Sequence, residues 1–234
     1  ETSRHRAGDS ADLSGALSEG PLVTEGPGLL VMDVDSTLIE QEVIELIAER
    51  AGTHELVAEV TARAMRGELD FAASLRERVA TLAGVPQGVF AEVLAEVRPT
   101  QGAAELIEAL HARGCRVGVV SGGFEEVVVP LAERLGIDHV AANRLEVVEG
   151  RLTGRVMGRI VDRQEKVRCL IAWAQQDGVP MERTIAVGDG ANDLGMLEAA
   201  GLGVAFCAKP VVVEQADAAI HVRDLRAVLQ LIGG

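Results

Sequence analysis

Short apolar runs alternate with helical patterns along most of this sequence, and that alternation limits the possible folds more than any other feature. Short apolar runs are typical of buried strands, and apolar residues spaced by three or four are typical of helices that cover a sheet. Strands that alternate with helices build a parallel sheet with helices on both faces, so the pattern predicts an α/β fold with a Rossmann-like parallel sheet. The strands are expected at 29–34, 116–120, 140–142, 184–187, 203–206 and 218–222. The helices that accompany them are expected at 102–113, 124–135, 163–177, 192–199 and 224–232.

Residues 41–100 do not follow this alternation. They contain successive helical patterns, separated by glycine-containing breaks, with no strand pattern between them. We expect a helical-bundle cap that lies over the carboxyl edge of the sheet and is inserted into an α/β core made of 28–40 and 101–234. The alternating stretch 143–154 carries a Glu-Gly turn and predicts a β-hairpin. The cap helices are expected at 42–50, 54–66, 71–82 and 88–97.

Residues 1–27 have a different composition from the rest of the chain. They are rich in Gly, Ser, Glu and Pro and show no apolar periodicity. This composition predicts a flexible N-terminal tail or linker.

The overall charge narrows the class of partner. The 234 residues carry a formal net charge of -14, which argues against nucleic acid or an anionic membrane as a partner. No apolar stretch approaches the roughly 18 residues that a membrane span needs, and no secretory signal pattern opens the sequence. Cys115, Cys169 and Cys207 form no C-x-x-C pattern, so we expect buried reduced thiols in a cytoplasmic protein. The oligomeric state stays open.

The first predicted strand ends in a pair of carboxylates, Asp33 and Asp35. Side chains two residues apart on a strand point the same way, and α/β proteins bind ligands at the carboxyl ends of their parallel strands. Two like charges this close are costly unless a cation or a shared proton compensates them. The pair therefore predicts a metal site.

A second strand end carries Ser121, Gly122 and Gly123. Glycines let a backbone approach a ligand closely, and free N–H groups at the start of a helix form an anion site. Such a turn is also common as a purely structural element, so this motif alone does not decide between the two interpretations.

A third strand runs into the string Gly188-Asp-Gly-Ala-Asn-Asp193. Asp193 and Asn192 could each serve only as helix caps. The position of the whole string, with Asp189, directly after an apolar strand favours a functional site.

A site that held Asp33, Asp35, Asp189 and Asp193 together with a phosphoryl group would carry a large excess of negative charge. Taken alone, Lys166 is typical of a solvated surface charge. Mg²⁺ and one buried lysine are nevertheless the smallest cationic set that could balance these acids, which makes Lys166 a candidate.

The order of these motifs resembles that of a known family. Asp33-Val-Asp-Ser-Thr, then Ser121-Gly-Gly, then Lys166, then Gly188-Asp-Gly-Ala-Asn-Asp193 is similar to the haloacid dehalogenase superfamily of aspartyl phosphotransferases. Within that superfamily the chain resembles the phosphoserine phosphatases over about residues 29–233. The closer resemblance rests on Glu42 after the first motif and on Ser74-Leu-Arg-Glu-Arg78, Ala142-Asn-Arg-Leu145 and Ala205-Phe-Cys-Ala-Lys-Pro210.

The resemblance implies a Mg²⁺-dependent phosphatase that hydrolyses O-phospho-L-serine, the last step of serine biosynthesis. Asp33 would be the nucleophile that forms an aspartyl-phosphate. Asp35 would be the general acid and base. Asp33, the backbone carbonyl of Asp35, and Asp189 would hold the metal, with Asp193 just outside, orienting waters or Lys166.

The remaining roles concern the substrate. By resemblance, Ser121, the amide of Gly122 and Lys166 would hold the phosphoryl oxygens. Gly123 and Asn192 would contact the substrate or its phosphate.

The cap would select the amino-acid part of the substrate. By resemblance Glu42 binds the ammonium group. Arg76 and Arg78 are both candidates for the carboxylate, but residues two apart on a helix lie about 200° apart, so only one can face the site. The family pattern selects Arg78. Met65 and Phe71 would line the pocket, or else belong to the core of the cap.

Other functions fit less well. A dehalogenase or an ion-pump phosphorylation domain has no need for the second acid, Asp35. The nearest alternatives are a phosphatase for another small metabolite, a phosphotransferase to a second alcohol, and a non-catalytic sensor of amino-acid phosphates. Intact Asp33, Asp35, Lys166 and Asp189 argue against the sensor.

Overall fold

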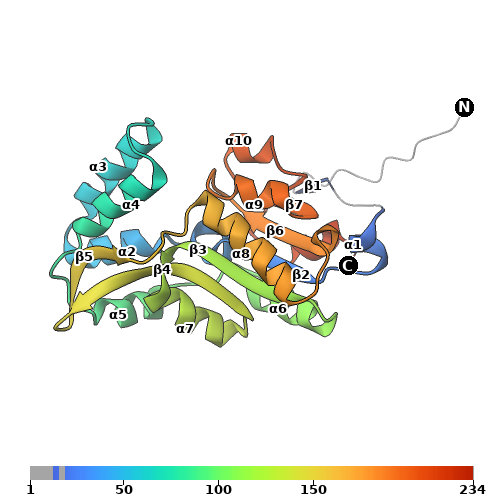
Figure 1. Cartoon of the computed structure of the whole chain (residues 1–234), viewed down its shortest axis with the longest axis horizontal. Helices are drawn as coiled ribbons and strands as arrows, with labels where there is room; N and C mark the ends of the chain where they lie inside the picture. Colours follow the sequence, from blue (N-terminus) through green and yellow to red (C-terminus); the bar gives the residue numbers. More distant parts are fainter. Residues whose placement is uncertain (1–12, 16–18, 234) are drawn as a thin grey trace, which may run out of the picture.

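The computed structural model describes residues 13–15 and 19–233. In this part of the chain one eight-stranded sheet has the order β1-β8-β7-β6-β2-β3-β4-β5 (Figure 1). Neighbours from β8 to β4 are parallel, as predicted, whereas β1 and β5 at the two edges are antiparallel to their partners. The strands are β1 Leu13–Ser14, β2 Leu29–Met32, β3 Arg116–Phe124, β4 His139–Val148, β5 Arg151–Met157, β6 Thr184–Gly188, β7 Leu202–Phe206 and β8 Ala218–Ile220. The helices are α1 Pro21–Thr24, α2 Val43–Ala51, α3 His54–Met65, α4 Phe71–Ala80, α5 Val89–Glu96, α6 Ala103–Ala112, α7 Glu125–Leu135, α8 Arg163–Gln176, α9 Leu194–Ala199, α10 Pro210–Val213 and α11 Ala227–Leu231.

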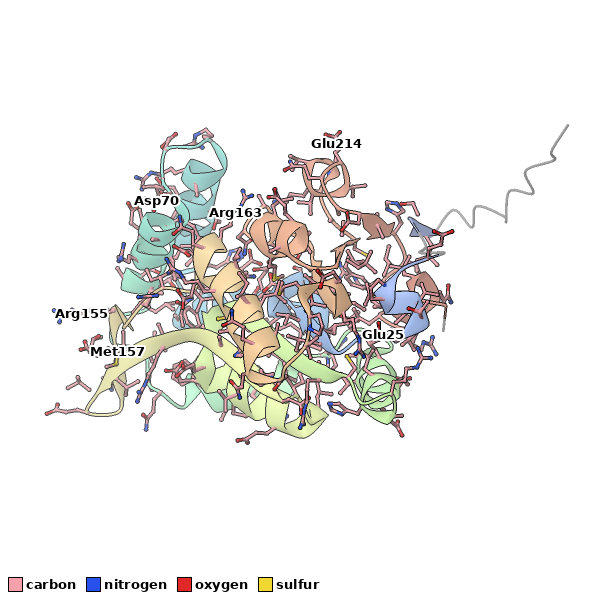
Figure 2. The ribbon with its side chains drawn as sticks, turned by 45° about the vertical axis from the view of Figure 1, so that its right-hand side comes forward. Glu25, Asp70, Arg155, Met157, Arg163 and Glu214 are labelled. Atoms are coloured by element: carbon pink, nitrogen blue, oxygen red, sulfur yellow. The ribbon has the colours of Figure 1, made fainter. Side chains whose placement is uncertain are left out.

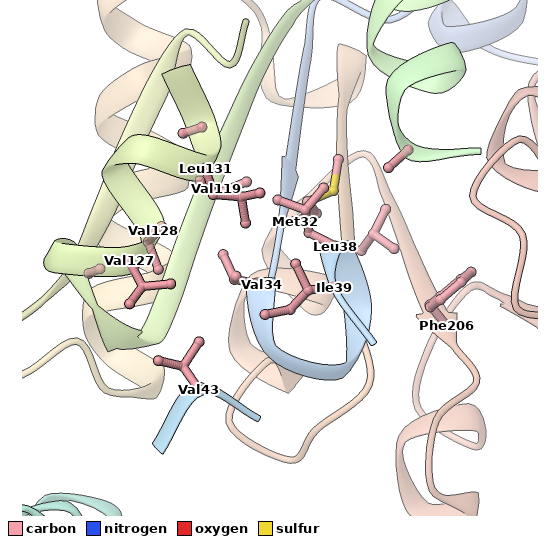
Figure 3. Packing of buried hydrophobic residues seen from close by; sticks show 14 of the residues in the cluster. Met32, Val34, Leu38, Ile39, Val43, Val119, Val127, Val128, Leu131 and Phe206 are labelled. Carbon is pink, nitrogen blue, oxygen red and sulfur yellow. The ribbon is translucent and has the colours of Figure 1, made fainter. Parts of the chain in front are cut away.

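The central strands are apolar on both faces because both faces are covered by helices. Leu30 and Met32 of β2 belong to the larger hydrophobic cluster, which includes residues of α6 and α7. Leu29 and Val31 point the other way, into a second cluster with residues of α8 and α9. Alternation along the strand thus fills two cores. Figure 3 shows part of the larger cluster, with Met32 near Val119 and the apolar side of α7.

The segment from α2 to α5 connects β2 to β3. In Figure 1, α3 and α4 project beside the sheet, while α5 lies next to α7. Buried residues of α2, α4 and α5, such as Ile47, Val79 and Val93, belong to the same cluster as the sheet residues. These helices are therefore packed on the α/β core through continuous apolar contact.

The prediction of a flexible tail over 1–27 is wrong for the described part of that range. The two residues of β1 pair with β8, and α1 carries Leu22, which is buried in the larger cluster. Burial of one leucine stabilises by roughly 1.5–3 kcal/mol, enough to anchor an otherwise polar stretch. Residues 1–12 and 16–18 lie outside the described residues.

Two predicted boundaries shift where the backbone bends sharply. The strand expected at 29–34 ends at Met32, because the carboxylate of Asp33 accepts a hydrogen bond from the amide of Val34 and a non-helical turn follows, with Asp35 extended and Ser36 at a left-handed φ. The helix expected from residue 124 begins one residue later, since β3 continues through Phe124.

A stacked pair joins α8 to the sheet at the amino end of β4. The rings of His139 and Trp173 have centroids 5.2 Å apart and an interplanar angle of 12°. His139 Nε2 also lies 2.7 Å from an Asp177 carboxylate oxygen. Gly118 on β3 leaves room for the indole, because a Cβ there would be 2.9 Å from it.

No helix within 13–15 and 19–233 combines the length and the hydropathy needed to cross a membrane.

Candidate active site

The turn after β2 presents the two carboxylates that the sequence places at a strand end. Asp33 and Asp35 both face one cavity. The Asp33 carboxylate accepts from the amide of Val34 at 2.7 Å, and the Asp35 carboxylate accepts from the amide of Val43 at 3.1 Å. Between them and α2 the chain passes through Ser36, which has a left-handed φ of 59°. Both acids line the cavity, but the period-two argument for their common direction is wrong, because β2 ends at Met32 and both residues lie in the turn that follows it.

Lys166 is fully buried at the start of α8 and lies between two acids. Its Nζ is 2.8 Å from Asp33 Oδ1 and 2.6 Å from Asp193 Oδ1. Burial lowers the pKa of Lys166, but the carboxylates of Asp193 and Asp33 outweigh it and raise that pKa above its usual value. The lysine is therefore held as a cation.

Three carboxylates meet beside this lysine. Asp33, Asp189 and Asp193 each offer an oxygen within 4.8 Å of the others. Burial and the nearby Asp193 raise the pKa of Asp189 to about 6, although the Thr37 hydroxyl donates to Asp189 at 3.0 Å. Burial and Asp193 also raise the pKa of Asp33 well above its usual range. The group carries more negative charge than one ammonium balances.

Asp35 has a different environment from Asp33. Burial, followed by repulsion from Glu42, raises the pKa of Asp35 to about 7. A carboxyl group with this pKa can both give and take a proton near neutral pH. The two acids of the motif thus differ in their contacts, since Asp33 contacts the buried ammonium and Asp35 faces a second carboxylate.

A cavity of about 530 Å³ lies over these groups and is closed by α3 and α4. Its volume is in the range of small-molecule sites. The lining residues are Asp33, Asp35, Glu42, Ile44, Thr61, Ala64, Leu69, Phe71, Ser74, Leu75, Arg78, Gly122, Gly123, Arg163, Asp189, Gly190, Ala191, Asn192 and Lys209.

The α2–α4 side of the cavity carries one acid and one cation. Glu42, just before α2, accepts from the Ser36 hydroxyl at 2.7 Å. Burial raises the pKa of Glu42, and Arg78 on α4 is among the groups that oppose the rise. Burial likewise lowers the pKa of Arg78. Of the two candidate arginines, Arg78 lines the cavity, whereas Arg76 is exposed and does not.

Gly122 and Gly123, in the last part of β3, form the opposite wall. Ser121 is fully buried, and its Oγ accepts from the amide of Gly123 at 2.8 Å. Gly122 lies against Phe71, because a Cβ at that glycine would be 2.9 Å from the ring. Asn143 on β4 donates to the carbonyl of Gly122 at 2.8 Å and fixes this part of β3.

The cavity gathers most of the residues predicted from sequence. Ser121, Lys166 and Asp193 do not line it and lie beneath its floor. The side chain of Met65 lies outside the described part of the structure.

Sequence reasoning missed three contributors. Thr37, inside the first motif, holds Asp189. Arg163 and Lys209 line the cavity as exposed cations, and Figure 2 shows Arg163 at the start of α8. Charge balance was a signal for Arg163, because a net acidic site that binds an anion needs several local cations.

Comparisons with known proteins agree with this geometry. The model of the haloacid dehalogenase-like hydrolases matches residues 30–198. The chain belongs to this family. A phosphoserine phosphatase from Streptococcus thermophilus is 54% identical over 210 residues, which are 90% of this chain and 98% of that protein.

Solved structures give the same assignment. A phospho-aspartyl intermediate analogue of phosphoserine phosphatase has a TM-score of 0.83 at 45% identity and covers 88% of this chain and 99% of its own. A substrate-bound phosphoserine phosphatase complex has a TM-score of 0.83 at 45% identity and covers 88% and 98%. The HAD-like α/β fold expected from the motifs is confirmed.

Proposed function

We propose that this chain is a phosphatase that hydrolyses O-phospho-L-serine to L-serine and phosphate through an aspartyl-phosphate. The observation that carries the proposal is a single cavity lined both by the strand-end acids Asp33 and Asp35 and by the pair Glu42 and Arg78. The first pair suits phosphoryl transfer, and the second suits an amino acid. The relatives named above carry the same activity in their names.

Asp33 is the proposed nucleophile. Its carboxylate attacks phosphorus and forms a P–O bond while the bond from phosphorus to the serine oxygen breaks. Asp35 gives its proton to the departing serine oxygen and then takes one from the water that attacks the aspartyl-phosphate. The support is the position of Asp35 at the cavity wall, with one oxygen held by the amide of Val43.

Gly122 and Gly123 lie next to the phosphoryl group, and Lys166 acts on it from beneath the cavity floor. Gly122 and Gly123 bring backbone to the cavity surface, where N–H groups can bind phosphoryl oxygens. Lys166, fixed by Asp193 at 2.6 Å, supplies a positive charge that needs no reorganisation during the reaction. The hydroxyl of Ser121 positions the two glycines by accepting a hydrogen bond from the amide of Gly123.

The acids fit a magnesium ion. The clustered donors of Asp33, Asp189 and Asp193 are carboxylate oxygens, the ligand type that Mg²⁺ prefers. Burial, followed by the charge of Asp193, raises the pKa values of Asp33 and Asp189, and a divalent cation would offset this repulsion. Asp33, the carbonyl of Asp35, and Asp189 would hold it. Both oxygens of Asp193 are engaged, Oδ1 by Lys166 and Oδ2 by the amide of Gly190, whereas Lys166 and the amide of Val34 contact only Oδ1 of Asp33. When bound, Mg²⁺ would offset the negative charge of the phosphoryl oxygens.

Substrate choice is assigned to the α2–α4 side of the cavity. Glu42 binds the ammonium of serine, and Arg78 binds its carboxylate through the planar guanidinium fork. Phe71 covers the short carbon chain and packs on Gly122. Asn192, on the opposite rim, contacts the phosphate side.

A substrate panel tests the proposal. Phosphate release with Mg²⁺ should show a clearly higher kcat/KM for O-phospho-L-serine than for phosphothreonine, glucose 6-phosphate and fructose 6-phosphate. Preference for a sugar phosphate would refute the substrate assignment while leaving a phosphatase. Absence of turnover on every phosphate ester, with retained binding of phosphoserine, would favour the sensor instead.

We also infer that the protein works in a reducing, cytoplasmic compartment. The support comes from the state of its three thiols. Cys115, Cys169 and Cys207 are free. Burial raises the pKa of Cys115 to about 12 and that of Cys169 to about 11, so these thiols stay protonated and inert. Only Cys115 is fully buried, however, so the expectation of buried thiols is wrong for the other two.

A further inference from the structure

The loop that carries Asp35 is held from outside by a residue distant in the sequence. Arg223, which follows β8, donates from Nη1 to the carbonyl oxygen of Ser36 at 2.9 Å. Its guanidinium carbon also lies 5.8 Å from the centroid of the Phe206 ring at the end of β7. The arginine therefore joins the loop to the far half of the sheet.

Ser36 needs such support because its conformation is unfavourable. A φ of 59° is uncommon for a residue with a side chain and persists only where the surroundings fix it. Three hydrogen bonds do so. The Ser36 amide donates to the carbonyl of Gln41 at 3.2 Å, its carbonyl accepts from Arg223, and its hydroxyl donates to Glu42 at 2.7 Å.

These bonds form a continuous path from Arg223 to the wall of the cavity. The residue at the end of the path, Glu42, lines the cavity and has the Ser36 hydroxyl as its side-chain hydrogen-bond partner. Loss of the guanidinium would free the Ser36 carbonyl and permit the residue to leave the left-handed region. The hydroxyl would then no longer point at Glu42.

We propose that Arg223 is a positioning residue for Glu42, acting through the carbonyl and hydroxyl of Ser36. The inference rests on the proposed function, since it assigns Arg223 to recognition of the substrate ammonium group. Arg223 governs how well the cavity distinguishes an amino-acid phosphate from an analogue without the amine, and it has little effect on the phosphoryl chemistry.

The test compares O-phospho-L-serine with the phosphate ester of 3-hydroxypropionate, which lacks only the ammonium group. Arg223→Met keeps an apolar stem over Phe206 but removes the donor. The KM for phosphoserine should rise roughly fivefold to tenfold, the effect of losing a hydrogen bond that orients a charged group. The kcat, and the KM for the analogue, should stay within about twofold of the parent.

Arg226→Met is the matched control. Arg226 pairs with Asp224 in the same segment and makes no contact with Ser36 among the hydrogen bonds of the described residues. It should leave the ratio of the two KM values unchanged. An equal shift of both KM values in Arg223→Met, or a shift of the ratio in the control, would overturn the proposal.

Ser36→Ala decides the case in which Arg223→Met does not fold. It removes the hydroxyl alone and should raise the KM for phosphoserine with the same selectivity. An unchanged ratio of the two KM values would overturn the proposed path from Arg223 through Ser36 to Glu42.

A crystal structure of Arg223→Met or, failing that, of Arg223→Lys addresses positioning without any substrate. Ser36 still at its left-handed φ with its bond to Glu42 intact in the folded methionine variant would also overturn it. A parent enzyme without preference for phosphoserine would instead refute the proposed function, and the crystal structure would still decide the role of Arg223.

Discussion

One buried ammonium group serves two carboxylates at the floor of the cavity. Lys166 contacts Asp33 at 2.8 Å and Asp193 at 2.6 Å. Asp193 is itself fixed by the amide of Gly190 at 3.0 Å. The carboxylate of Asp33 is thus positioned by Lys166, which Asp193 holds in turn, and this would limit the geometries from which Asp33 could attack as the proposed nucleophile.

Asp33→Asn tests the nucleophile. The amide cannot form the acyl phosphate, so turnover should fall by roughly a thousandfold or more. Phosphate release measures the rate, and mass spectrometry of acid-quenched enzyme measures the phosphoryl adduct, which should be absent. A variant that keeps either turnover or the adduct would rule out Asp33 as the nucleophile.

Arg78→Ala tests how the substrate carboxylate is recognised. Truncation of a buried charge partner costs several kcal/mol, so kcat/KM for phosphoserine should fall by about a hundredfold. The kcat/KM for p-nitrophenyl phosphate, which has no carboxylate, should change only a few-fold. Arg76→Ala is the control, because Arg76 lies exposed on the same helix. Equal losses on the two substrates would contradict the role of Arg78.

At the scale of elements, the close approach of α9 to β6 depends on a glycine, Gly188, at the end of the strand. A Cβ on Gly188 would be 2.5 Å from the carboxyl carbon of Asp193, which is buried and cannot move aside easily. The glycine therefore lets the helix start directly against the strand end.

Gly188→Ala should displace Asp193 from Lys166. We expect destabilisation of about 1–3 kcal/mol from overpacking, together with a loss of kcat, measured by urea unfolding and phosphate release. Gly88→Ala is the matched control, since no atom lies within 4 Å of a Cβ there and its φ is -56°. A Gly188→Ala variant with parental stability and kcat would show that the contact is not needed.

Asp138, in the turn between α7 and β4, ties three elements together. Its carboxylate accepts from the amide of Val117 at 2.9 Å, from Arg116 at 2.6 Å, and lies 2.9 Å from His111 Nε2. Burial alone would raise the pKa of Asp138, but these partners outweigh it and lower that pKa below its usual value.

The lowered pKa gives a pH dependence with a definite sign. The charged carboxylate stabilises the fold above the ordinary pKa of 3.8, and this contribution is lost as the pH falls through the lower folded value. Asp138→Asn should reduce the free energy of unfolding by about 1–2 kcal/mol at pH 7. Urea titrations from pH 7 to pH 3 should show the gap to the parent narrowing with acid. A gap that widens would contradict the assignment.

The elements that the sequence predicted best are those with an uninterrupted pattern. β6, β7 and α8 appear close to their expected bounds, because apolar periodicity reports burial directly. The antiparallel pairing of β1 with β8 was missed, since two residues in a polar stretch carry no period. The turn at 34–38 was also missed, because its bend depends on a hydrogen bond that the amide of Val34 donates to the Asp33 carboxylate rather than on a pattern of residue types.

In the candidate site, too, the residues with a local sequence pattern could be predicted and those without one could not. Asp33, Asp35 and Asp189 follow from their positions at strand ends, whereas the choice of Arg78 over Arg76 needed the family pattern or the structure. Contacts between distant segments, such as Thr37 with Asp189 and Arg223 with Ser36, leave no local signal in one sequence.

For the whole molecule, the net charge of -14 opposes the approach of a phosphate ester. Arg163 and Lys209 are exposed cations at the cavity and lie where an incoming anion would pass. Local positive groups of this kind raise the concentration of an anionic ligand near the site, and added salt screens them with a Debye length near 10 Å at 0.1 M.

The double variant Arg163→Ala, Lys209→Ala should lower kcat/KM for phosphoserine by roughly twofold to fivefold at low salt, with kcat little changed. The difference from the parent should shrink between about 20 and 300 mM NaCl. Arg113→Ala, Arg134→Ala is the control with the same change in net charge, because both arginines are exposed outside the cavity. An equal effect of the control pair would assign the loss to net charge.

Trp173, stacked on His139, can serve as an intrinsic fluorescence probe of this protein. The sequence has one tryptophan and no tyrosine, so its intrinsic fluorescence above the phenylalanine range comes from a single indole. That indole lies against β3 and β4 at the amino end of the sheet and does not line the cavity. Its emission should follow the unfolding of the α/β core and stay constant when substrate binds. Catalytic variants can therefore be sorted by fluorescence into those that weaken the core and those that affect only the chemistry.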